Sequence, residues 1–189
     1  MSYSKSLLAL VFISPHCLGG NLNIVHLAPT NELKLEIKAG GLNQEFSLSP
    51  QGITGVFALP QKPAVLRTIG DETPSLKISA KVIGQIAVLH AAGESFKWSI
   101  YDSKPTGGKT TLRLINLTEE DVIVLQGVTK ISLKSKTELP VEKVTKAPIR
   151  LSFENGEKVK PYEQEEPSAV IGFVYKSGAA WSIFYVNDT

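Results

Sequence analysis

The sequence predicts an all-β protein built from two tandem β-sandwich-like units that are related by internal duplication. Three observations support this fold class. Apolar residues alternate with polar residues in short runs, which is the period of a half-buried strand. Glycine and proline occur throughout, and no stretch of a dozen residues keeps a helical period. Similar strand–turn–strand blocks end the two halves of the chain.

Residues 1–20 have the pattern of a secretory signal peptide. Lys5 is the only charged residue in this segment, and the apolar run Leu7–Ile13 follows it. Small residues come after the run, so cleavage is expected near Gly19 or Gly20. The segment predicts an exported protein, either periplasmic or extracellular. The alternative interpretation is a buried first strand or helix.

The only cysteine, Cys17, lies inside this predicted signal. A lipoprotein signal needs a small residue just before its cysteine, and His16 occupies that place, which disfavours lipidation without excluding it. If the segment is removed, the mature chain has no cysteine, and its stability depends on packing rather than on disulfides.

The first unit is expected over residues 21–101, where the segments Glu32–Lys38 and Leu76–Val82 alternate strictly. Polar residues rich in glycine and proline at 102–109 predict a linker. The second unit follows over 110–189. Its best hairpin is expected at Ile149–Tyr162, where Asn155-Gly156 favours a type I′ turn.

The internal duplication is predicted from matching blocks at both ends of each half. Trp-Ser-Ile occurs in the last strand of each half, with Trp98 and Trp181 separated by 83 positions. The opening strands match at a larger offset of 90, since Leu27 corresponds to Leu117. The second unit is therefore expected to be about seven residues shorter, with the missing residues before its final hairpin.

Composition and motifs argue against several function classes. The formal net charge of +2 comes from dispersed lysines and arginines, so no nucleic-acid partner is expected. No apolar stretch reaches the ~18 residues of a transmembrane span. Gly107-Gly108-Lys109-Thr110 is similar to the end of a phosphate-binding loop, but Ser103 stands where that motif needs glycine, and a strand follows instead of a helix. No cofactor is expected.

Histidines and carboxylates form no recognisable catalytic or metal-binding pattern. His26 and His90 lie in apolar strands, and the chain has no His-x-His or cysteine pair, which favours partly buried sheet histidines over zinc ligands. The cluster Glu163, Glu165 and Glu166 lacks the glycine of a calcium loop and predicts a solvated loop. We therefore predict no catalytic, cofactor-binding or metal-binding residues and expect that the protein is not an enzyme.

Trp98 and Trp181 are the remaining candidates for a binding site. Each occurs in an apolar final strand, and equivalent core positions explain them because a buried tryptophan removes a large apolar area from water. The alternative is a ligand platform, since exposed tryptophans on a β-sandwich can stack against sugar rings.

The segment Leu112–Thr118, followed by an acidic turn and another apolar strand, resembles the opening of small bacterial envelope β-sandwich modules of unknown function. The layout of two such modules behind a signal is similar to that of the periplasmic accessory proteins of alginate acetylation. This resemblance implies a non-catalytic periplasmic subunit of a polysaccharide-modifying assembly, and no residue role is carried over from it.

The expected function is thus an exported, non-enzymatic interaction or accessory protein of the cell envelope, whose partner is a protein or a glycan. One alternative is a carbohydrate-binding module that uses Trp98 or Trp181. Another is an enzyme whose site has no recognised motif.

Overall fold

The computed structural model describes residues 18–70, 75–79, 84–104, 111–141, 148–163 and 169–188. Their regular structure consists of strands, and none of these residues lies in a helix. The all-β prediction is confirmed. Nowhere in these ranges is there a helix with the length and hydropathy needed to cross a membrane.

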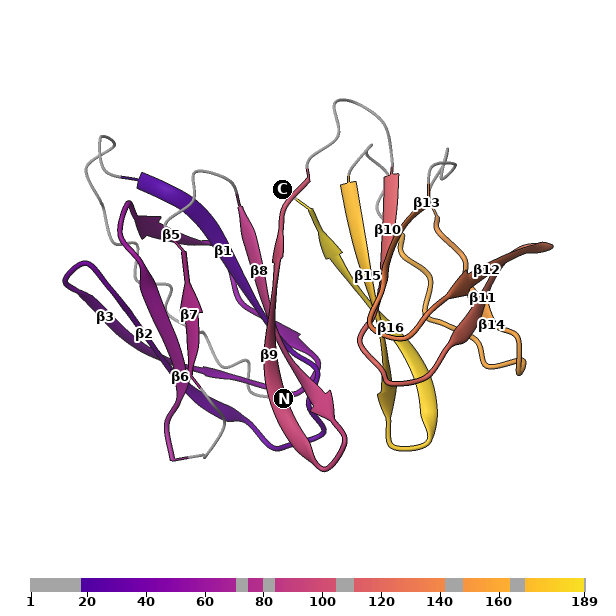
Figure 1. Cartoon of the computed structure of the whole chain (residues 1–189), viewed down its shortest axis with the longest axis horizontal. Coiled ribbons are helices and arrows are strands. Elements are labelled where there is room, and N and C mark those ends of the chain that lie inside the picture. Colours follow the sequence, from indigo (N-terminus) through magenta and orange to yellow (C-terminus); the bar gives the residue numbers. More distant parts are fainter. Residues whose placement is uncertain are drawn as a thin grey trace, which may run out of the picture.

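Nine strands form the first unit (Figure 1, indigo to magenta). They are β1 (Leu18–His26), β2 (Leu33–Ala39), β3 (Leu42–Leu48), β4 (Gly52–Ile53), β5 (Phe57–Pro60), β6 (Ala64–Thr68), β7 (Leu76–Ile78), β8 (Gln85–Ala92) and β9 (Ser95–Asp102). Sheet A has the order β4-β1-β8-β9, and β5 also pairs with β1. Sheet B has the order β3-β2-β6-β7. Only β1 and β8 pair in parallel within this described part.

Seven strands form the second unit (Figure 1, orange to yellow). They are β10 (Thr111–Asn116), β11 (Val122–Gln126), β12 (Thr129–Leu133), β13 (Glu138–Val141), β14 (Ser152–Phe153), β15 (Ala169–Ser177) and β16 (Ala180–Asn187). Sheet C has the order β13-β10-β15-β16, in which β10 and β15 are parallel. Sheet D has the order β12-β11-β14.

Each unit has its own apolar core between its two sheets. In the first unit Leu22 and Ile24 of sheet A pack in one cluster with Leu35 and Ile37 of sheet B. Sheets C and D enclose a second cluster that is centred on residues such as Phe153. Both cores use alternate residues of their strands, because successive side chains of a strand point to opposite faces.

A third apolar cluster joins the two units, and it lies between sheets A and C. The four sheets therefore stack in the order B, A, C, D (Figure 1). This stacking explains why Gln85–His90 on β8 and Ala169–Tyr175 on β15 are buried without interruption. A strand with apolar neighbours on both faces carries a continuous apolar run rather than an alternating one.

The two units pair their strands in the same way. Strands β10, β11, β12, β13, β14, β15 and β16 correspond to β1, β2, β3, β4, β6, β8 and β9. From the end of β3 onward, equivalent residues lie 85 positions apart, as with Ile53 and Glu138 or with Val88 and Phe173. This shared pairing agrees with an internal duplication but does not establish a common origin, so the duplication itself stays a prediction.

The turns repeat at the same interval. Gln51 and Lys136 are the two non-glycine residues with positive φ in the described ranges, at 53° and 54°. Gly93 and Gly178 each have a φ of 64° at the first central position of a two-residue hairpin turn. Glycine is favoured there because the turn needs a positive φ that side chains with a Cβ adopt at a cost.

The match between the two Trp-Ser-Ile blocks is out of register by two residues. Trp98 pairs with Leu89 across its hairpin, whereas Trp181 pairs with Lys176. The position equivalent to Trp98 is therefore Ile183. The two tryptophans do not occupy equivalent places, and that part of the prediction is wrong.

The second unit is also five residues shorter than the first, rather than seven. The offset is 90 in β1 and β10, where Val25 corresponds to Ile115, and 85 from Leu48 and Leu133 onward. Four of the five residues are absent from the β11–β12 hairpin, since Leu33 pairs with Leu48 but Val122 already pairs with Leu133.

The predicted hairpin at Ile149–Tyr162 is present, because these two residues bridge each other. Its turn differs from the expected type I′. Only Gly156 has a positive φ, and its N–H donates to the Phe153 carbonyl at 3.0 Å. This is a type I turn followed by a glycine bulge, in which Asn155 keeps a negative φ.

The predicted boundaries fall partly outside the described residues. Residues 1–17, including Cys17, and the motif Gly107–Thr110 lie there. Strand β1 begins at Leu18, whose backbone is aligned with Pro60, so the first strand includes the last three positions of the expected signal. Strand β9 ends at Asp102, where the linker was expected to begin.

Candidate functional site

Sheets A and C present equivalent positions to one another. Their shared cluster contains the equivalent pairs Val25 and Ile115, Leu27 and Leu117, Ile86 and Ile171, and Val88 and Phe173. The rings of Tyr101 and Phe173 lie 5.4 Å apart across this interface. An interface that uses the same patch from both sides has twofold character, as in a symmetric dimer. The units therefore pack together about an approximate internal twofold axis.

Three clefts at the junction of the units are arranged about this axis. One of them is lined by equivalent residues of the two units, such as Gly93 and Gly178, and therefore lies near the axis. We call it the axial cleft. The other two lie away from the axis and are equivalent to each other. We call them the charged cleft, which contains Arg113, and the tyrosine cleft, which contains Tyr162 and Tyr185.

The axial cleft has a volume of about 370 Å³ and is lined by residues of both units. Leu27 and Leu117 lie in its wall as one equivalent pair, and Gly93 and Gly178 are another. His90 and Tyr175, which also correspond to each other, lie here as well. A pocket that holds a few polar groups on an apolar wall is the usual form of a binding site.

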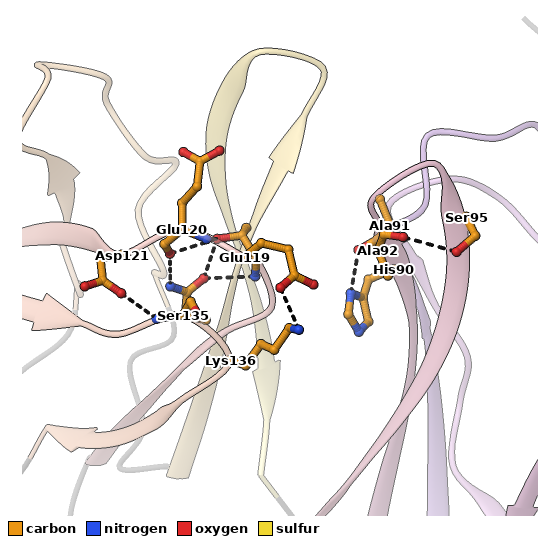
Figure 2. A network of polar contacts seen from close by, with 11 residues as sticks. His90, Ala91, Ala92, Ser95, Glu119, Glu120, Asp121, Ser135 and Lys136 are labelled. Atoms are coloured by element: carbon orange, nitrogen blue, oxygen red, sulfur yellow. Dashed lines mark hydrogen bonds and ion pairs between the residues drawn. The ribbon is translucent and has the colours of Figure 1, made fainter.

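The loop after β10, which carries Glu119 and Glu120, forms one wall of this cleft (Figure 2). The hydrogen bonds of Asn116 organise this loop. Its side-chain amide donates to the Glu120 carbonyl at 2.8 Å and to the Lys134 carbonyl at 3.2 Å. Its Oδ1 accepts the backbone N–H of Thr118 at 3.0 Å. Asn116 is fully buried, and these bonds satisfy its polar atoms while they fix the loop against the end of β12.

This loop carries three acids, each paired with a lysine. The N–O distances are 2.6 Å for Glu119–Lys136, Glu120–Lys176 and Asp121–Lys134. The hydrogen bond from Lys136 lowers the pKa of Glu119, and the bond from Lys134 lowers the pKa of Asp121. The equivalent loop of the first unit has Pro29 and Thr30 instead, so the charged rim belongs to the second unit.

His90 faces this rim from the first unit (Figure 2). Its Nδ1–H donates to the Ala91 carbonyl at 2.9 Å, which leaves Nε2 to accept the Ser99 hydroxyl at 2.9 Å. Burial is the main cause that lowers the pKa of His90 to about 4, and the Lys97 ammonium acts in the same direction. The Ala91 carbonyl and Glu119 oppose the shift. His90 is therefore neutral near pH 7, and both of its ring nitrogens already have partners.

His26 is held in a similar way but lies outside the axial cleft. Its Nδ1–H donates to the Leu48 carbonyl at 3.2 Å, and its Nε2 accepts from Thr30 Oγ1 at 2.9 Å. Burial lowers its pKa, although nearby backbone carbonyls oppose this. Both histidines were expected to be partly buried, and both are fully buried, with exposures of 0% and 2%.

The charged cleft contains ion pairs of the second unit and hydrogen bonds that reach the end of the first unit. Arg113 lies 3.2 Å from Glu138 and 3.2 Å from Asp188, and it donates to the carbonyl of Asp102 at 3.0 Å. The backbone N–H of Lys104 also donates to Asp188. Because Asp102 and Lys104 precede β10, these bonds anchor the end of the first unit to the second. These contacts could not be predicted from the sequence, because the residues that form them are far apart in the chain.

The tyrosine cleft has a volume of about 330 Å³ and carries no charged residue in its lining. The rings of Tyr162 and Tyr185 lie 5.6 Å apart at an angle of 48°. Tyr162 donates its hydroxyl to Asn187 Oδ1. The Tyr185 hydroxyl and the Asn23 Oδ1 are closed off from solvent and have no hydrogen-bond partner in the described part of the chain. Burial raises the pKa of Tyr185.

The two tryptophans that were considered as a ligand platform pack against separate cores. Trp98 is half-buried on the first core, and its Nε1 has no partner among the residues that the structure describes. Trp181 packs on the second core, with its ring 5.7 Å from that of Phe153. The Lys176 ammonium lies 4.9 Å from the Trp181 ring. Neither tryptophan lines any of the three clefts.

Metal-binding geometry is not found in the described ranges, where no group of three or more His, Cys, Asp or Glu side chains is placed around a common point. Of the acidic cluster, Glu163 is exposed, while Glu165 and Glu166 lie outside those ranges. No protein-family model matches the chain, and no curated protein matches it either.

Proposed function

We propose that the chain is an exported, non-enzymatic interaction or accessory protein of the cell envelope, and that a protein partner binds at the axial cleft. The cleft between the loop at Glu119–Asp121 and the end of β8 at His90 carries this proposal. Both walls are in place in the chain alone, so the site is formed before a partner arrives. A preformed site loses less conformational freedom on binding.

The chemistry of this cleft suits recognition better than proton transfer. A general base needs a free ring nitrogen or carboxylate with a pKa near the working pH. His90 uses both nitrogens within the protein, and burial lowers its pKa to about 4. Glu119 is held by Lys136, which lowers its pKa as well. The mixed rim of acids and lysines offers complementary charges to a protein surface.

Site-specific crosslinking tests the binding site. A photoreactive residue at Thr118, which lies in the wall of the cleft, is expected to capture a discrete partner from the envelope of the native host. Reversing the rim charges with Glu119→Lys and Glu120→Lys is expected to reduce capture. Glu154→Lys is the matched control, because Glu154 forms a similar exposed pair with Lys130 on sheet D. Equal loss in the control, or no captured partner, would contradict the proposal.

Export is tested separately. The mature protein is expected in the envelope or the medium, with an N-terminus near Gly19 or Gly20 when its intact mass is measured. Cleavage there would shorten β1 only at its start, because its pairing with β5 continues at Asn21 and Leu22. Recovery of the uncleaved chain from the cytoplasm would contradict this part of the proposal.

A further inference from the structure

The tyrosine cleft and the charged cleft are the same place in the two halves of the molecule, with different side chains. Asn187 of the tyrosine cleft stands where the charged cleft has Asp102. Two further exchanges continue the pattern: Asn23 corresponds to Arg113, and Ile53 corresponds to Glu138. The charged groups at these three positions of the charged cleft are thus replaced by neutral ones in the tyrosine cleft.

The two clefts also differ in how their polar atoms are satisfied. In the charged cleft, Arg113 pairs with Glu138 and Asp188 and donates to the Asp102 carbonyl, and of its nitrogen atoms Nε has no partner among the described residues. In the tyrosine cleft, the Asn23 Oδ1 and the Tyr185 hydroxyl have no partner within the described residues. Buried polar atoms are normally paired, so two unpaired ones in one cleft indicate hydrogen bonds that a ligand would supply.

The lining defines the chemistry of that ligand. Tyr162 and Tyr185 present aromatic surface, and their tilted rings lie 5.6 Å apart. The amide oxygen of Asn23 can only accept a hydrogen bond, while a phenol can donate or accept one. Val56 and Ile53 add apolar surface at the rim, with exposures of 56% and 42%. No lining residue is charged, which disfavours acidic or basic ligands because their ions would lose hydration without a counter-charge.

We propose that the tyrosine cleft binds a neutral sugar residue of a saccharide. A sugar hydroxyl both donates and accepts, so adjacent hydroxyls satisfy the Asn23 oxygen and the Tyr185 phenol together. The C–H face of the sugar ring packs on the tyrosine rings. The cleft, at about 330 Å³, is at the small end of the range of about 300–1,000 Å³ for ligand sites. This site is distinct from the axial cleft and does not depend on the function proposed there.

Binding is tested by NMR titration of the full chain with neutral oligosaccharides of glucose, mannose or N-acetylglucosamine. Shifts are expected for the backbone amides of Tyr185, Val186 and Thr54, and none for those at the axial cleft. A uronic-acid oligosaccharide of the same length is expected to bind at least about tenfold more weakly. Tighter binding of that acidic oligosaccharide or of a neutral tripeptide, or no shift with any neutral saccharide at millimolar concentration, would overturn the assignment.

Variants at the rim keep the test independent of folding. Val56→Lys places a charge at the cleft from an exposed position and is expected to weaken binding by about tenfold or more. Val128→Lys, at a valine that is 99% exposed on the β11–β12 turn, is the matched control and should bind normally.

A second pair of variants compares the equivalent clefts. Tyr185→Phe removes only the unpaired hydroxyl and is expected to weaken binding about two- to tenfold, in line with one hydrogen bond. Lys77→Ala, in the charged cleft, should leave binding unchanged. If Lys77→Ala weakened binding as much as Tyr185→Phe, the saccharide would not be bound in the tyrosine cleft.

Discussion

His26 and Asn116 occupy equivalent positions, and each ties the end of its strand to the end of the neighbouring hairpin. The His26 ring donates to the carbonyl of Leu48, and the Asn116 amide lies 3.5 Å from the carbonyl of Leu133 and donates to that of Lys134 at 3.2 Å. Leu48 and Leu133 are themselves equivalent. Two different side chains thus perform the same structural task, and only the one in the second unit also shapes a wall of the axial cleft.

Replacing Asn116 is therefore expected to be costly. Asn116→Ala removes hydrogen bonds to Thr118, Glu120 and Lys134 and leaves partly buried backbone groups without these partners. The free energy of unfolding should fall by about 2–3 kcal/mol, measured by urea denaturation. Asn43→Ala, at an exposed asparagine of β3, is the control and should change it by less than about 0.5 kcal/mol. Similar losses in the two variants would contradict the role of Asn116.

Stability is expected to decrease in mild acid because of His90. Its folded pKa is about 4, below the unfolded value of 6.5, so the unfolded chain binds more protons between these values. The contribution is complete above pH 6.5 and is lost as the pH falls to about 4, at up to about 1.4 kcal/mol per pH unit. The lowered pKa of His26 acts in the same direction.

Urea midpoints measured between pH 4 and pH 7 test this titration. His90→Gln removes the titrating group while it keeps a side chain that can form hydrogen bonds, and it is expected to flatten the pH dependence. An unchanged slope in this variant would show that other groups cause the acid sensitivity.

Arg113 is expected to be the most sensitive charged residue of the junction. The side chains of Arg113 and Asp188 are only 8% and 3% exposed, so Arg113→Ala leaves a buried carboxylate without its partner. The expected loss of unfolding free energy is about 3–5 kcal/mol. Adding Asp188→Asn should restore part of it, which a double-mutant cycle measures.

Lys104→Ala is the control for Arg113, because Lys104 pairs with the same Glu138 but is 62% exposed. Exposed pairs contribute about 1 kcal/mol or less. A loss in Lys104→Ala that equals the loss in Arg113→Ala would contradict the importance of burial at this joint.

The apolar interface predicts that both units unfold together. Phe173→Ala removes a ring that is fully buried between sheets A and C and contacts Tyr101, so stability should fall by about 3–5 kcal/mol. Calorimetry should show one transition for the original chain and two partly separated transitions for the variant. Phe184→Ala, at the half-buried rim of the same interface, should have a smaller effect. Two transitions in the original chain would mean that the interface does not couple the units.

Much of the fold could be predicted because strand periodicity is a local signal. The segments Glu32–Lys38 and Leu76–Val82 alternate, and each overlaps a strand, at Leu33–Ala39 and Leu76–Ile78. Whether the units pack together could not be decided from the alternating strands. The relevant signal in the sequence is the nearly continuous apolar run Ala169–Tyr175. Its residues are all buried, because sheet C has apolar neighbours on both faces.

Register was harder to predict, as the tryptophans illustrate. A shared tripeptide aligned Trp98 with Trp181, but hairpin turns at Gly93 and Gly178 set the true register two residues away. A shift of two residues keeps each side chain on the same face of its sheet. Both rings therefore still lie on their own cores, although their equivalence was wrong.

The candidate clefts could not be predicted, because each is assembled from distant segments. The tyrosine cleft joins Asn23 and Thr54 of the first unit to Tyr162 and Tyr185 of the second. None of these residues forms a local motif. Their proximity follows from the packing of sheet A on sheet C, which a single sequence does not specify.

Only eight residues, 103–110, separate β9 from β10, and this short tether has a consequence for the interface between the units. A tether of this length keeps the partner face at an effective concentration on the order of millimolar, so even a modest affinity keeps the pair closed. A true homodimer must match one surface to itself, and every substitution then occurs twice. A single chain is free of that restriction. Arg113 and Asn23 can therefore differ at equivalent positions, and only Arg113 forms ion pairs at the junction.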